Sequence, residues 1–99
     1  MPAGIRPSDI NAQTWIRGAF ATEDMNRAAT WVVRFCQARG GNDWRSFSLA
    51  EIDQFHSERT GGRLFDFGGL SVGGLVEGGG KGFVPTAEFI QRCHRASPA

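Results

Sequence analysis

One glycine-rich stretch constrains the fold of this chain more than any other: residues 67–91, which read FGGLSVGGLVEGGGKGFVPTAEFIQ. Gly74 predicts the end of a helix, because glycine adopts the left-handed conformation that closes a helix without steric cost. The run 78–82, GGGKG, permits the positive φ angles of a tight turn between two short extended segments. The predicted order is therefore helix, strand, tight turn, strand, and a closing helix from about Thr86.

The residues before this stretch predict a long helix that begins after Thr22. A hydroxyl at that position, followed by Glu23 and Asp24, meets the unpaired N–H groups and the dipole of a first helical turn. The apolar residues that follow are three or four positions apart, which places them on one face. They are Met25, Ala28, Ala29, Val32, Phe35 and Cys36. Gly40 and Gly41 are expected to end this helix.

A short edge strand and a second helix are expected next. Large apolar and polar residues alternate from Trp44 to Phe47, as in a strand able to pair with the hairpin. Ser48 and Glu51 then form the S-x-x-E capping box, which predicts a helix ending near Thr60. Its expected core stripe consists of Leu49, Ile52 and Phe55. A further helix is expected over residues 63–74, carrying Leu64, Phe67 and Leu70.

Length and composition indicate one small domain. The chain has 99 residues, of which 40% are hydrophobic, enough for a modest core. We expect an N-terminal arm over residues 1–21, with a short helix from Ser8 that carries Ile10, Trp15 and Ile16, a folded domain over 22–95, and a frayed end over 96–99. A net charge of +1 excludes a strong overall field, and no apolar run approaches the roughly 20 residues that span a bilayer. A soluble, cytoplasmic protein without a membrane partner is expected.

The sequence does not match the usual motifs for catalysis or metal binding. Cys36 and Cys93 lack paired spacing and are expected to be buried, reduced thiols. A zinc site combining them with His56 and His94 lacks the usual ligand spacings, and a cysteine nucleophile paired with a histidine ranks no higher. The glycine run before Lys81 does not match a phosphate-binding loop. We therefore expect no enzyme activity, no cofactor and no metal.

Two fragments resemble the winged helix-turn-helix family. They are F-x-x-L-x-x-x-G-L-V from Phe67 to Val76 and G-F-V-P-T-A-E-F-I from Gly82 to Ile90. The resemblance covers roughly residues 22–95. It implies an α+β, mainly helical fold, with a three-helix core, a small antiparallel β-hairpin wing and a C-terminal helix.

The resemblance also implies a function, that of a small DNA-binding protein acting as a transcriptional regulator or DNA-associated accessory factor. The helix over residues 63–74 would enter the major groove, and the wing would approach a phosphate or the minor groove. The side chains that this placement offers to duplex DNA are Arg45, Arg59, Arg63, Ser71 and Lys81. Contacts of this kind bind mainly phosphates and weaken steeply with salt.

A second class of function fits the same residues. Direct base readout needs long polar side chains, and over residues 63–74 only Arg63 offers one, while Asp66 repels phosphate. The alternative is a winged-helix protein–protein interaction module without DNA binding, anchored by apolar residues such as Val72, Trp15 or Trp44. A homodimer formed through residues 8–17 is a further expectation.

Overall fold

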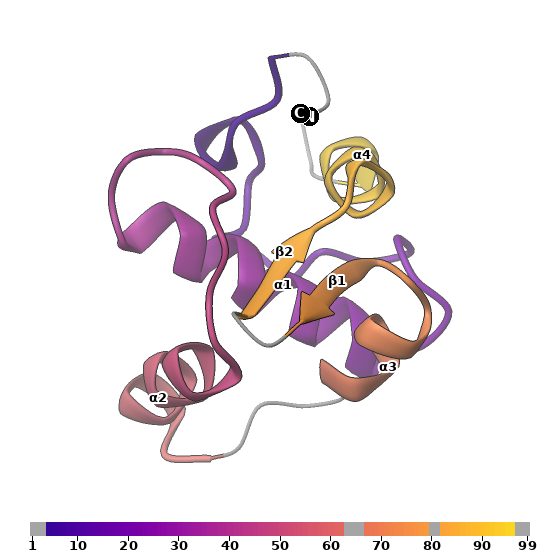
Figure 1. The fold of residues 1–99 in the computed structure, drawn as a ribbon. Helices are drawn as coiled ribbons and strands as arrows, with labels where there is room; N and C mark the ends of the chain where they lie inside the picture. Colours follow the sequence, from indigo (N-terminus) through magenta and orange to yellow (C-terminus); the bar gives the residue numbers. More distant parts are fainter. Residues whose placement is uncertain (1–3, 63–66, 80–81, 97–99) are drawn as a thin grey trace.

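The computed structural model describes residues 4–62, 67–79 and 82–96. Within these ranges the fold is α+β and mainly helical, with four α-helices and a two-stranded antiparallel hairpin. The helices are α1 (Glu23–Ala38), α2 (Leu49–Thr60), α3 (Phe67–Val72) and α4 (Ala87–Ala96), and the strands are β1 (Val76–Gly79) and β2 (Gly82–Pro85). In Figure 1, α2 and α3 lie on opposite sides of the hairpin, and α1 passes behind it.

Helix α1 confirms the prediction from its capping residue and apolar stripe. The Thr22 side chain accepts a hydrogen bond of 3.0 Å from the Met25 N–H group. All the predicted stripe residues from Ala28 to Cys36 are buried. Thr30, Trp31 and Val33 are buried as well, so the helix is enclosed on more than the predicted face and packs against α2, α3 and the N-terminal turn at residues 7–9.

The N-terminal segment differs from the helix expected after Ser8. Only a single 3-10 turn, η1 (Pro7–Asp9), forms there, and Ile10 and Ile16 are buried in irregular chain. Side chains of α1 satisfy this backbone in place of helical hydrogen bonds. The Gln37 amide donates to the Pro7 and Ile10 carbonyls at 2.8 Å each, and the Ile16 N–H group donates to Thr30 Oγ1 at 3.0 Å. In place of the expected helix, residues 10–20 form an irregular segment hydrogen-bonded to α1, called the N-terminal strap below.

Helices α2 and α3 follow the local signals in the sequence. Ser48 and Glu51 form the predicted capping box, with reciprocal hydrogen bonds of 2.9 and 3.0 Å, and the left-handed Gly61 ends α2 directly after Thr60. Ile52 is buried, whereas Leu49, at the first position of the helix, is 48% exposed and does not belong to the core. Helix α3 is described only from Phe67, so the first turn expected for it lies outside the described residues.

The two strands of the predicted hairpin pair in a regular register, while residues 80–81 of the predicted glycine turn lie outside the described residues. Val76 pairs with Pro85, and Gly79 pairs with Gly82. The strand expected between Trp44 and Phe47 is reduced to one antiparallel bridge, in which Phe47 and Phe83 exchange N–H···O bonds of 2.9 and 2.7 Å. The next hydrogen-bonded pair of this ladder would join Arg45 to Pro85, which has no N–H group to donate. The third strand therefore stops after one residue.

Candidate functional site

The described part of α3 offers little for reading DNA bases. Phe67 and Leu70 face the core, while Val72 is 91% exposed and Ser71 is partly exposed. Between Phe67 and Val72 there is no Arg, Lys, Asn or Gln side chain. Arg63 and Lys81, which the sequence nominates for DNA contact, lie outside the described residues.

The other two nominated arginines belong to separate local networks. Arg45 forms an ion pair of 2.9 Å with Asp43 and donates to the Gly40 carbonyl at 3.2 Å. Arg59 lies at the end of α2, with its guanidinium 3.7 Å from the centre of the Phe55 ring. Arg45 is therefore committed to its own loop, whereas Arg59 keeps an exposed charge stacked on an aromatic ring.

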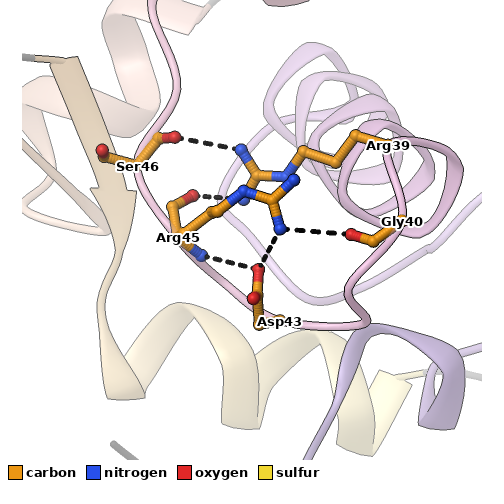
Figure 2. Close-up of polar contacts among 5 residues, drawn as sticks. All are labelled: Arg39, Gly40, Asp43, Arg45 and Ser46. Atoms are coloured by element: carbon orange, nitrogen blue, oxygen red, sulfur yellow. Dashed lines mark hydrogen bonds and ion pairs between the residues drawn. The ribbon is translucent and has the colours of Figure 1, made fainter.

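The loop around Arg45 is fixed by a second arginine, as Figure 2 shows. Arg39 donates one hydrogen bond of 3.0 Å to the Ser46 carbonyl and another to the Arg45 carbonyl. The Asp43 carboxylate also accepts from the Arg45 N–H group at 3.4 Å, a long contact. These bonds hold the backbone of residues 43–46 beside β2, although it forms no ladder there beyond Phe47.

A groove of about 540 Å³ opens where this loop separates from β2. Its apolar wall includes Trp44, Val84 and Ile90, and its polar rim includes Arg45 and Glu77. The remaining lining residues are Asp43, Pro85, Thr86 and Ala87. The groove thus combines a loop, the end of the hairpin opposite its turn and the first turn of α4. Its size falls in the range of ligand-binding clefts.

The end of the groove formed by α4 is anchored by Thr86. Its hydroxyl donates to the Leu75 carbonyl at 2.9 Å and accepts from the Phe89 N–H group at 3.2 Å. The Thr86 N–H group also donates to the Leu75 carbonyl at 3.1 Å. Hydrogen bonds therefore fix both the loop wall and the α4 wall of the groove.

The three apolar residues nominated as partner anchors have different surroundings. Val72 is open to solvent, and Trp15 is 37% exposed with the Arg34 guanidinium 4.7 Å from its ring centre. Trp44 is buried, and its indole N–H group donates to the Ile5 carbonyl at 2.9 Å. Trp44 is thus a fixed wall of the groove and not a projecting anchor, which corrects the sequence-based expectation.

The side chain of His56 is packed in the core. His56 is buried, with Nδ1 3.1 Å from the Gly62 carbonyl and its ring edge-on to Trp31. Within the described ranges no group of three or more His, Cys, Asp or Glu side chains is arranged to hold a metal ion.

Burial makes both cysteine thiols poor nucleophiles. It raises the pKa of Cys36 to about 11 and that of Cys93 further still. At pH 8 only about a thousandth of Cys36 is thiolate on that pKa. We expect a disulfide reagent such as DTNB to label both thiols more than about 100-fold more slowly in the native protein than in denaturant. Equal rates in the two conditions would contradict the buried placement.

Comparisons with known proteins give no relative: no family model, no curated protein and no solved structure matches the chain. Among the described helices, none is both long and apolar enough to cross a membrane. The groove, which sequence reasoning did not find, joins residues more than 40 positions apart. The only local hint is Pro85, whose missing N–H group prevents an adjacent strand from closing over β2.

Proposed function

We propose that the chain is a winged-helix domain. The order of elements supports this: α2 and α3 follow one another, a two-stranded hairpin follows α3, and α4 follows the hairpin. Gly74, at φ +72°, ends the α3 region where the resemblance places the end of a reading helix. The hairpin would then be the wing.

We further propose that this domain binds a partner protein, with the groove as its docking site. The observation that carries the proposal is the groove itself, an apolar cleft with a charged rim and prearranged walls. Val84 is 37% exposed there, and the neighbouring Trp44 and Ile90, which are 3% and 1% exposed, back the groove from the core. A partner side chain that fills such a cleft removes apolar surface from water at about 25 cal/mol per Å².

The rim indicates the chemistry of the partner segment. Glu77 is exposed and forms no ion pair with any described residue, whereas Arg45 is already neutralised by Asp43. The groove therefore presents one uncompensated negative charge next to apolar walls. The partner that fits is a protein segment with a large apolar residue flanked by Lys or Arg.

Two matched substitutions test this site. A display library of random short peptides is selected on the wild-type domain, and the enriched peptides are measured on Val84→Glu and Val72→Glu. Val84→Glu places a charge in the groove and is expected to weaken binding at least about tenfold. Val72→Glu makes the same chemical change on α3 and is expected to leave binding within about twofold. Failure to enrich any peptide, or loss of binding in Val72→Glu alone, would refute the groove as the docking site.

Duplex DNA is the second candidate ligand, favoured by Arg59. Its guanidinium is exposed, stacks on Phe55 and pairs with no carboxylate in the described part of the chain. If DNA is bound, Arg59→Ala, Arg63→Ala and Lys81→Ala each weaken retardation of a duplex, and affinity falls steeply with added salt. The absence of any retardation at low salt would eliminate this function and leave the protein partner.

A further inference from the structure

Three arginines line a second hollow, which shares no lining residue with the groove. The hollow, of about 390 Å³, lies between the N-terminal strap and the last turns of α4, and its charged side chains are Arg17, Arg92 and Arg95. The other described lining residues are Gly18, Ala19 and Ala96, so no acidic side chain contributes to this wall.

Only one of the three charges is compensated. Arg92 forms an exposed ion pair of 3.0 Å with Glu88, one turn earlier on α4. Arg17 and Arg95 are exposed and make no hydrogen bond or ion pair with any residue that the structure describes. Arg95 is favoured in part by the C-terminal end of the α4 dipole, but Arg17 has no such partner. The hollow therefore has an excess of two positive charges.

The backbones that carry these arginines are fixed. On the strap, the N–H groups of Ile16 and Phe20, on either side of Arg17, donate to Thr30 Oγ1 at 3.0 Å and Asn26 Oδ1 at 2.8 Å. Between them Gly18 has φ +73°, a conformation that glycine adopts without strain. Like charges held together by fixed backbones repel one another, and a bound anion removes that repulsion.

We propose that this hollow binds a doubly charged phosphate group, as carried by a phosphomonoester or pyrophosphate. Guanidinium groups match phosphate oxygens with paired N–H donors, and two uncompensated arginines match the charge of the dianion. The site is independent of the groove and goes beyond the proposed protein docking. Arg17 and Arg95 are the residues expected to contact the anion, whereas the charge of Arg92 is shared with Glu88.

The test is a titration of the ¹⁵N-labelled protein with pyrophosphate at low salt, followed by NMR. We expect saturable shifts centred on the amides of Gly18, Ala19 and Ala96. Arg17→Gln and Arg95→Gln are each expected to weaken the apparent affinity about tenfold. Arg6→Gln removes the same charge from another exposed position of the N-terminal segment and is expected to change affinity less than about twofold.

Two further readouts separate a built site from diffuse attraction or damage to the fold. Pyrophosphate should raise the melting temperature of the wild type, while Arg17→Gln without ligand should melt no lower than the wild type, since it relieves repulsion without removing a charge from a helix end. Lack of saturation, an equal effect of Arg6→Gln, or lower stability of Arg17→Gln would overturn the proposal. Binding of a single-stranded oligonucleotide without binding of pyrophosphate would also overturn it, because a phosphodiester backbone would then be the ligand.

Discussion

Replacing Phe47 by alanine is expected to lower the free energy of unfolding by about 4 kcal/mol. Phe47 is 1% exposed, and its ring centre lies 5.7 Å from that of Phe35, 6.1 Å from that of Phe67 and 6.5 Å from that of Phe83. It therefore joins α1, α3 and β2 in one aromatic cluster. Its loss leaves a cavity among rings that cannot all collapse into the space. Equilibrium unfolding in urea, followed by circular dichroism, measures the change.

Phe47→Leu is the matched control, because it keeps most of the apolar volume and is expected to cost less than about 1.5 kcal/mol. A domain of this size has a total stability of roughly 5–15 kcal/mol, so the alanine variant is expected to be strongly weakened. If alanine cost no more than leucine, Phe47 would not be the central contact of the core.

Gly82→Ala is expected to cost about 3 kcal/mol, from a strained backbone and two weakened hydrogen bonds. Gly82 has φ +118°, and a Cβ atom there would lie 2.6 Å from the Phe47 carbonyl oxygen. That oxygen accepts the bond from Phe83, so the added methyl group pushes the loop away from β2. The same urea experiment measures the loss.

Gly68→Ala is the control for this substitution. Gly68 lies in α3 with an ordinary helical φ, and a Cβ atom there would meet nothing within 4 Å. Alanine at this position should raise stability by up to about 1 kcal/mol, because it favours the helix. Changes of the same sign in the two variants would contradict the role assigned to the Phe47–Phe83 bridge.

Local chemistry explains which elements the sequence predicted correctly. The Thr22 cap, the capping box of Ser48 and Glu51, and the left-handed Gly74 each act within a few residues of the chain. Their outcome does not depend on distant partners. The limits of α1, the start and end of α2, and the two paired strands of the hairpin therefore followed from sequence alone.

Long-range partners explain the two elements that differed. The segment after Ser8 remains irregular because Gln37 and Thr30 of α1 satisfy its backbone groups. The strand expected over residues 44–47 is limited to Phe47 because Pro85, 40 residues after its expected partner Arg45, has no N–H group to donate. Neither contact appears in a local pattern.

The candidate site was harder to predict than the fold for the same reason. Arg45 was nominated for DNA, but Asp43 and the Gly40 carbonyl already bind its guanidinium. The groove that it borders forms only when the loop, the hairpin and α4 come together. The sequence did indicate where the DNA hypothesis is weak: no side chain between Phe67 and Val72 is suited to reading bases.

Docking of a partner segment in the groove between residues 43–46, β2 and α4 is tested most directly by an NMR titration of the ¹⁵N-labelled domain with a peptide selected on it. Saturable shifts are expected to centre on the amides of Trp44, Arg45, Val84 and Ala87, with little change at Val72. Shifts centred on α3, with the groove amides unmoved, would contradict it.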